Sequence, residues 1–99
     1  MERAHNYFVY LLASKRNGTL YCGVTSDLTG RTQTHREDLI EGFTRRYGVH
    51  RLVWYQWTDN VTGAIQREKQ IKKWNRAWKI RLIEEGNPTW EDLYPRLFQ

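Results

Sequence analysis

The sequence predicts a small α+β domain in which a three-stranded antiparallel sheet is flanked by helices. Segments rich in β-branched and aromatic residues alternate with segments of helical period, in the order ββαβαα. A chain of 99 residues, 39% of them apolar, can bury a core of modest size. We expect a single domain over residues 1–99, with a body over about 6–85 and a tail over 86–99 that packs back onto it.

The first two strands are predicted to form a hairpin. Residues 7–13 and 19–24 are rich in Val, Tyr and Leu, and Asn17-Gly18 lies between them. Asn-Gly is typical of a two-residue type I′ turn, because both positions of that turn need a positive φ. A third strand is expected over residues 52–58.

A helix is expected after the hairpin. Ser26 or Asp27 can cap this helix, and its body is expected to extend to about Ile40. Residues 42–48 follow, a basic and aromatic segment with a glycine at each end, which is typical of a loop.

Two further helices are expected after the third strand. The first begins at Asp59 or Thr62 and continues to about Trp74. The second covers residues 76–85, and Gly86-Asn87-Pro88 ends it because these residues do not continue a helix.

The composition indicates the class of partner. Lys and Arg number 16 against 11 Asp and Glu, which gives a net charge of +5 and a sequence pI near 9.6. This excess attracts polyanions, nucleic acid first among them, although a merely soluble basic protein has the same balance. The sequence indicates no small-molecule cofactor and leaves the oligomeric state open.

The cellular compartment follows from cysteine content and hydropathy. Cys22 is the only cysteine, which excludes an intrachain disulfide and fits a reducing compartment. The sequence shows neither a signal-peptide pattern nor an apolar run of about 18 residues. We therefore expect a cytoplasmic protein without a membrane partner.

Five side chains are candidates for catalysis: Tyr10, Tyr21, Arg31, His35 and Glu68. A carboxylate can hold a hard divalent cation, and an arginine can neutralise charge that develops on a phosphate. A tyrosine or a histidine can transfer a proton. Together these groups provide what metal-assisted phosphodiester hydrolysis requires, with Glu68 as the metal ligand.

Each candidate also has a purely structural interpretation. Glu68 lies on an apolar helical stripe, where a buried pair with an arginine or a tyrosine would also satisfy it. Arg31 and His35 are neighbours on one helix face and can form a partly exposed pair without a role. Tyr10 and Tyr21 can serve core packing, since aromatic residues favour strands.

The order and spacing of these residues resemble the GIY-YIG nucleases, in particular the small stand-alone bacterial type called URI-domain proteins. Phe8-Val9-Tyr10 stands where that family has Gly-Ile-Tyr, and Tyr21-Cys22-Gly23 stands where it has Tyr-Ile-Gly. The segment from Gly30 to His35 resembles the family's Arg-x-x-x-His helix, and the segment from Arg67 to Ile71 resembles its glutamate-bearing helix. The resemblance covers about residues 6–95.

The resemblance implies a GIY-YIG fold that brings the five side chains together on one concave face, with one Mg²⁺ or Mn²⁺ held by Glu68. The implied activity is endonucleolytic hydrolysis of DNA that leaves 5′-phosphate and 3′-hydroxyl ends, and either tyrosine can be the general base. Phe8 departs from the family's leading glycine. Asn87 or Asn75 would match an asparagine that larger relatives place beyond the glutamate.

Two clusters combine cations with aromatic residues, a combination that suits single-stranded nucleic acid. The expected nucleic-acid contacts are Arg45, Arg46 and Tyr47 in the first cluster and Lys72, Lys73 and Trp74 in the second. They favour single-stranded or distorted DNA, to which small relatives are also linked, although Trp74 can instead belong to the core. The alternative function is a non-catalytic nucleic-acid-binding module that acts as a partner in DNA repair, recombination or uptake.

Overall fold

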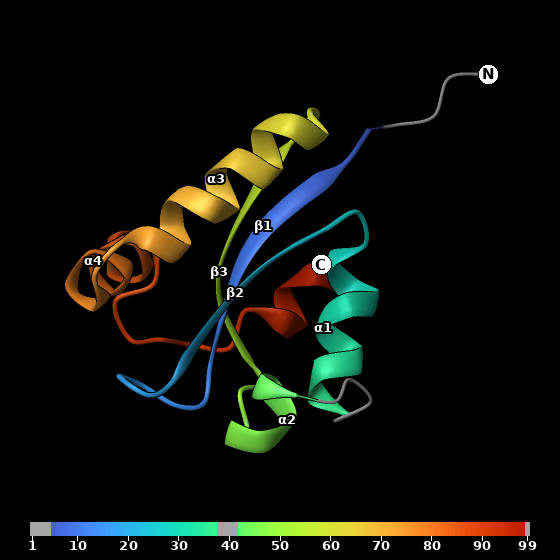
Figure 1. The fold of residues 1–99 in the computed structure, drawn as a ribbon. Coiled ribbons are helices and arrows are strands. Elements are labelled where there is room, and N and C mark those ends of the chain that lie inside the picture. Colours follow the sequence, from blue (N-terminus) through green and yellow to red (C-terminus); the bar gives the residue numbers. More distant parts are fainter. Residues whose placement is uncertain (1–4, 38–41, 99) are drawn as a thin grey trace.

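The computed structural model describes residues 5–37 and 42–98 (Figure 1). Its elements are β1 (Tyr7–Ala13), β2 (Leu20–Thr25), α1 (Leu28–Arg36), α2 (Phe43–Tyr47), β3 (Arg51–Thr58), α3 (Val61–Lys73), α4 (Arg76–Gly86) and the 3₁₀-helix η1 (Tyr94–Phe98). The strands form an antiparallel three-stranded sheet in the order β2-β1-β3. The predicted α+β class is confirmed.

Both faces of the sheet are covered by other elements. Successive side chains of a strand point alternately to these two faces. Val9, Leu11 and Ala13 of β1 pack against residues of α3 and α4. Tyr10 and Leu12 point to the other face and pack with residues of α1 and η1. Figure 1 shows α3 and α4 on one side of the sheet and α1 with η1 on the other.

The strand β2 lies at an edge of the sheet. The central strand β1 places Tyr10 opposite Gly23 of β2 and opposite Tyr55 of β3. Because β2 has a strand neighbour on one side only, side chains from both faces of the sheet can reach its outer edge.

The hairpin between β1 and β2 is confirmed, but the predicted two-residue turn is wrong. The strands pair up to Ala13 and Leu20, so the connecting loop is longer than two residues. Asn17 has a φ of 58°, whereas Gly18 is not at a positive φ. Arg76 Nη2 donates to the Asn17 carbonyl at 2.7 Å and to the Gly18 carbonyl at 2.6 Å. This contact from α4 supports a loop conformation that the local sequence does not specify.

The helix α1 begins where predicted and ends early. Asp27 caps it, since the Asp27 Oδ1 accepts the Gly30 N–H at 3.1 Å. The helix ends at Arg36, before the expected Ile40, which lies outside the described residues.

Residues 43–47, predicted as part of a loop, form the short helix α2. Gly48, at a φ of 63°, ends this helix in the left-handed conformation that glycine adopts readily. Thr44 is 3% exposed and attaches the helix to the rest of the protein. A helix this short is stable only through such tertiary contacts.

The helices α3 and α4 lie where the sequence placed them, with one cap corrected. Asn60, and neither Asp59 nor Thr62, caps α3 by accepting the N–H of the third helical residue at 3.1 Å. Asn75 caps α4 in the same way at 3.0 Å. Among the described residues, no helix has the length and apolar character that a membrane span needs.

The C-terminal segment lies against the body of the protein. Trp90 is fully buried. The Leu93 N–H donates to the Leu52 carbonyl at 2.8 Å, near the start of β3. Asp92 forms an ion pair with Arg36 of α1 at 2.5 Å. The segment therefore contacts both α1 and the sheet.

Candidate active site

Tyr10 occupies the centre of the candidate site. Its side chain is 1% exposed and lies on the α1 face of the sheet. The Tyr10 ring crosses Gly23, its neighbour in β2, so that a Cβ at position 23 would lie 2.5 Å from both Cζ and Oη of Tyr10. Only a glycine leaves room for this ring, which gives a physical reason for the glycine in the Tyr-Cys-Gly motif.

His35 joins Tyr10 to the helix α2. Tyr10 Oη lies 3.2 Å from His35 Nε2, and His35 Nδ1 lies 2.9 Å from Thr44 Oγ1. His35 is 2% exposed. Burial lowers the pKa of His35, and the nearby Arg31 guanidinium and His50 imidazole act in the same direction. The imidazole is therefore neutral at pH 7, with one ring nitrogen donating and the other accepting.

Tyr21 is the more accessible of the two motif tyrosines. It is partly buried, and its ring centroid lies 5.3 Å from that of His35 and 6.3 Å from that of Tyr10. The three rings thus form one cluster on the α1 face. Within this cluster Tyr21 can contact a substrate, whereas Tyr10 lies beneath the surface.

The environment of Tyr10 keeps its hydroxyl protonated. Burial raises the pKa of Tyr10 far above its usual range, and the adjacent Tyr21 phenol adds to the increase. The Arg31 guanidinium acts in the opposite direction. Tyr10 is therefore suited to hold its neighbours by hydrogen bonds rather than to carry a negative charge.

Arg31 lies on the exposed side of α1, one turn before His35. Its charge acts on the pKa of both Tyr10 and His35, so the guanidinium lies close to the aromatic cluster. Arg31 also lines an open hollow of about 380 Å³ at the junction of β2 and α1. The same hollow is lined by Asp27 and Thr34, and the exposed Arg31 guanidinium is the group there that can neutralise a bound anion.

Glu68 lies on the opposite side of the sheet from the tyrosines. It belongs to α3, which packs against Val9 and Leu11 and not against Tyr10. The helices α1 and α3 cover different faces of the sheet, so a surface shared by all five side chains has to extend around the edge strand β2.

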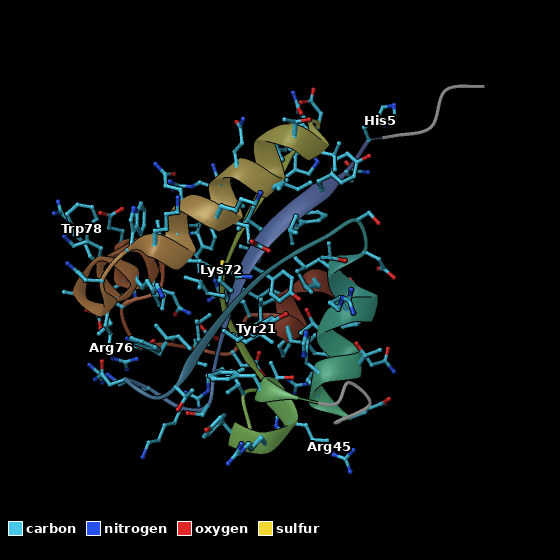
Figure 2. All side chains as sticks on the ribbon, in the orientation of Figure 1. His5, Tyr21, Arg45, Lys72, Arg76 and Trp78 are labelled. Atoms are coloured by element: carbon cyan, nitrogen blue, oxygen red, sulfur yellow. The ribbon has the colours of Figure 1, made fainter. Side chains whose placement is uncertain are left out.

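Glu68 nevertheless lies beside the edge strand. The pKa of the Cys22 thiol is raised to about 11. Burial is the largest cause of this increase, and the negative charge of Glu68 is the second largest. Cys22 precedes Gly23 and follows Tyr21 in β2, so Tyr21 and Glu68 flank the same strand from its two faces. Figure 2 shows Tyr21 and Lys72, the neighbour of Glu68, both beside β2. The candidate site surrounds a strand edge.

Glu68 also fits the requirements of a divalent cation. Its side chain is 16% exposed, and its Oε1 lies 3.4 Å from Nζ of Lys72, whose side chain is 51% exposed. The ammonium group of Lys72 thus lies beside the Glu68 carboxylate. The described part of the chain contains no group of three or more His, Cys, Asp or Glu placed to hold a metal. Mg²⁺ does not need one, because it keeps several waters and uses one or two carboxylates together with substrate phosphates.

Both candidate asparagines have structural roles. Asn87 is 6% exposed, and its Nδ2 donates to the carbonyls of Val53 at 3.1 Å and Glu91 at 2.8 Å. Its Oδ1 accepts the Glu91 N–H at 2.9 Å. These bonds join β3 to the C-terminal segment, while Asn75 caps α4.

The first cation–aromatic cluster lies on α2, next to the tyrosines. Tyr47 is 49% exposed, and the Arg46 guanidinium carbon lies 5.6 Å from the Tyr47 ring centroid. Arg45 is exposed on the same helix. Phe43, which the sequence prediction omits, is 46% exposed and has its ring centroid 6.4 Å from that of Tyr21.

The second cluster lies at the junction of α3 and α4. Lys72 and Lys73 are exposed, whereas Trp74 is partly buried and packs on the core. Trp78 is 55% exposed, and its ring meets that of Trp74 edge to face at 5.9 Å. Figure 2 shows Trp78 and Arg45 at different ends of the molecule, so the two clusters form separate surfaces.

The sequence prediction omits two residues that contact the site: Phe43 and Thr44. Both lie in the segment predicted as a loop. The alternation of aromatic and basic residues between Gly42 and Gly48 does indicate an exposed binding surface. Nothing in that segment identifies Thr44 as the partner of His35, because their contact depends on how α2 packs against α1.

The fold and the order of these motifs match a family of catalytic domains. Residues 6–81 match the family model described as the GIY-YIG catalytic domain. The match includes both tyrosines, Arg31, His35 and Glu68. The chain belongs to the GIY-YIG family, whose catalytic domain indicates nuclease chemistry on nucleic acid.

Within this family the chain is similar to small bacterial proteins named UPF0213. It is 34% identical over 85 residues to a UPF0213 protein of Bacillus pumilus, with 86% of this chain and 85% of that protein covered. It is 33% identical over 81 residues to one of Staphylococcus aureus, with 81% and 96% covered. The solution NMR structure of a UPF0213 protein from Bacillus halodurans is 28% identical, with 88% and 92% covered and a TM-score of 0.55. That likeness confirms the fold.

Proposed function

We propose that this protein is a metal-dependent endonuclease that hydrolyses phosphodiester bonds in single-stranded or distorted DNA. The observation that carries the proposal is the placement of Tyr21 and Glu68 on the two sides of the edge strand β2, with Arg31 near the Tyr10–His35 pair. The membership of the chain in a family of catalytic domains that act on nucleic acid agrees with it.

In the proposed reaction a water attacks the phosphorus and the bond to the 3′ oxygen breaks, which leaves a 5′-phosphate and a 3′-hydroxyl. Tyr21, the accessible phenol, orients the water and accepts its proton while passing its own proton to Tyr10. Tyr10 passes a proton to Nε2 of the neutral His35, 3.2 Å away. This relay avoids a free tyrosinate, of which only about 0.1% is present at pH 7 for a phenol of pKa ~10.

Arg31 stabilises the transition state in this account. Its guanidinium is exposed and close to the tyrosines, where it neutralises charge that accumulates on the phosphoryl oxygens. A single preorganised donor of this kind typically contributes a factor of about 10²–10³ in rate. Arg31 therefore has a larger role in the reaction than in the stability of the fold.

Glu68 would hold the divalent ion through its carboxylate oxygens. A Mg²⁺ or Mn²⁺ ion held there would supply Lewis-acid chemistry to the phosphodiester. Lys72, which now pairs with Glu68 at 3.4 Å, can turn instead to a phosphate of the strand. Glu68 thus contributes the negative charge and the hard oxygen ligand that the cation requires.

The test of this function is a cleavage assay on labelled single-stranded and duplex DNA of one sequence. Reactions contain Mg²⁺, Mn²⁺ or EDTA, and Glu68→Ala is purified in parallel. We expect metal-dependent cleavage of the single strand by the wild type and none by Glu68→Ala. Equal cleavage by both proteins would contradict the proposal, because it would indicate a contaminating nuclease.

The same assay distinguishes the proposed nuclease from the second candidate function, a non-catalytic binding module. A non-catalytic nucleic-acid-binding module would bind the single strand and leave it intact with either metal. The observation that favours this alternative is that the described residues contain no group of three or more His, Cys, Asp or Glu placed to hold a metal.

A further inference from the structure

The helix α2 presents two aromatic rings to solvent beside the candidate active site. Phe43 is 46% exposed and Tyr47 is 49% exposed, and their ring centroids lie 4.8 Å apart. We call these two residues the α2 shelf. Paired rings with half of their surface in water are typical of binding surfaces, because such rings gain free energy when they are covered.

The α2 shelf continues directly from the tyrosine cluster. The ring planes of Tyr21 and Phe43 differ by 29°, with centroids 6.4 Å apart. Tyr21, Phe43 and Tyr47 therefore follow one another from the candidate site toward open solvent. A DNA strand that lies on the shelf can therefore continue over an unbroken row of aromatic rings to Tyr21 in the candidate site.

One hydrogen bond fixes the shelf relative to the site. Thr44, which lies next to Phe43 in α2, places its Oγ1 2.9 Å from Nδ1 of the buried His35. The same five-residue helix thus contacts the proton relay on its inner side and carries the shelf on its outer side. A base that stacks on the shelf is therefore held at a fixed distance from Tyr10 and His35.

Two arginines of α2 place positive charge beside the shelf. Arg46 lies over the Tyr47 ring at 5.6 Å, and both arginines of α2 line an open hollow beside the two rings. The helix contains no acidic residue. Arginines beside exposed aromatic faces suit a phosphate backbone whose bases are unpaired. A duplex keeps its base faces stacked on one another and offers none to the shelf.

We propose that the α2 shelf binds the unpaired bases next to the scissile phosphate, so that the protein selects single-stranded DNA by stacking rather than by reading base edges. Stacking accepts every base, because each has an aromatic face. Arg46 adds the contact to the backbone. This inference rests on the proposed nuclease function and names the part of the protein that chooses its substrate.

Tyr47→Ala is the test variant, because the Tyr47 ring is half exposed. Phe43 lies between Tyr47 and the tyrosine cluster, so the substitution leaves that cluster intact. Tyr47→Trp keeps a stacking face at the same position. Tyr55→Ala is the matched control, since it removes a ring of 38% exposure from β3, at the other edge of the sheet. Fluorescence anisotropy in EDTA gives Kd for single-stranded and duplex DNA without any need for cleavage. A 2-aminopurine base moved along the strand reports stacking through its quenching.

We expect Tyr47→Ala to weaken single-strand binding about tenfold and to abolish the quenching, because one stacked base contributes roughly this factor. Tyr47→Trp and Tyr55→Ala should bind as the wild type does, and duplex affinity should not change. Unchanged single-strand affinity in Tyr47→Ala, or an equal loss on duplex, would overturn the proposal. Tighter binding of RNA of the same sequence, or no single-strand binding by the wild type, would overturn it as well.

The outcomes also separate this inference from the nuclease assignment. If the wild type binds and quenches as expected but cuts no strand with Mg²⁺ or Mn²⁺, the shelf is supported and the nuclease function is wrong. If the wild type cuts DNA and Tyr47→Ala retains the same preference for single strands, the nuclease function is supported and the shelf is wrong.

Discussion

Tyr10 and Gly23 are in contact across β1 and β2, and the Tyr10 ring fills the space that a side chain at position 23 would need. The distance from a Cβ at position 23 to Cζ and Oη of Tyr10 would be 2.5 Å. The same Oη lies 3.2 Å from His35 Nε2. The absence of a side chain at Gly23 therefore determines where the hydroxyl of Tyr10 is held.

The first prediction follows from this contact. Gly23→Ala should destabilise the protein by about 1–3 kcal/mol, because an extra carbon in a packed site forces the neighbouring ring to shift. Urea unfolding provides the free energy of unfolding. Gly86→Ala is the control, since the same added carbon at Gly86 would meet nothing within 4 Å. A Gly23→Ala protein as stable as this control would show that the Tyr10 ring moves at no cost.

Stability should also depend on the protonation of His35. Burial lowers the pKa of His35 in the folded protein, whereas the unfolded chain titrates near 6.5. Below this value the unfolded state binds more protons than the folded state, so stability should decrease as the pH falls from about 6.5 and should be highest above it.

Urea unfolding at a series of pH values checks this dependence. The His35→Gln variant should lose the part of the pH dependence that His35 causes, while His5→Gln, an exposed histidine, should keep it. The same dependence in the wild type and in His35→Gln would assign it to another group.

Arg31→Ala should separate catalysis from folding. Because Arg31 is exposed, its removal should change the free energy of unfolding by no more than about 0.5 kcal/mol. The cleavage rate should fall by a factor of about 10²–10³, because a donor to the transition state is lost. Single-turnover cleavage, unfolding and single-strand affinity are measured on the same preparation.

The control for this variant is Arg81→Ala, which removes an arginine whose side chain is 82% exposed on α4. This control should cleave DNA at the wild-type rate. Cleavage by Arg31→Ala at the rate of Arg81→Ala would remove Arg31 from the mechanism.

Local sequence determines the strands and helices well but not the turn between β1 and β2. Strand residues of β1 and β3 have the composition that pleated, half-buried positions favour. The turn depends on Arg76, which is distant in sequence and donates to the carbonyls of Asn17 and Gly18. The turn propensities of Asn17 and Gly18 alone cannot predict a loop conformation that depends on this distant arginine.

The grouping of both tyrosines with Arg31 and His35 was implied by the resemblance to the GIY-YIG nucleases, whereas spacing alone made only Arg31 and His35 neighbours. Tyr10 and Tyr21 belong to paired strands, and His35 lies one turn after Arg31 on a helix that packs on those strands. The side of the sheet that carries Glu68 was not predictable in this way. Helical period shows that Glu68 faces the sheet side of α3, but the face that α3 covers depends on the connections of the whole chain.

In the proposed reaction Tyr21 and Glu68, which flank the edge strand β2 from its two faces, act together on one phosphodiester. A double-mutant cycle with Tyr21→Phe, Glu68→Gln and the combined variant tests it through single-turnover cleavage of single-stranded DNA with Mn²⁺. Glu68→Gln should remain folded, because the Glu68–Lys72 pair that it removes is a helix pair worth only about 0.3–0.5 kcal/mol. Tyr21→Phe should remain folded because it keeps the ring that packs with Tyr10 and His35.

If the two groups serve one reaction, each single variant should lose most of the activity, and the combined variant should be no slower than the slower of the two, since residues that act as a unit are not additive. Rate losses that multiply, or wild-type cleavage by Tyr21→Phe, would contradict a shared site at the edge of β2.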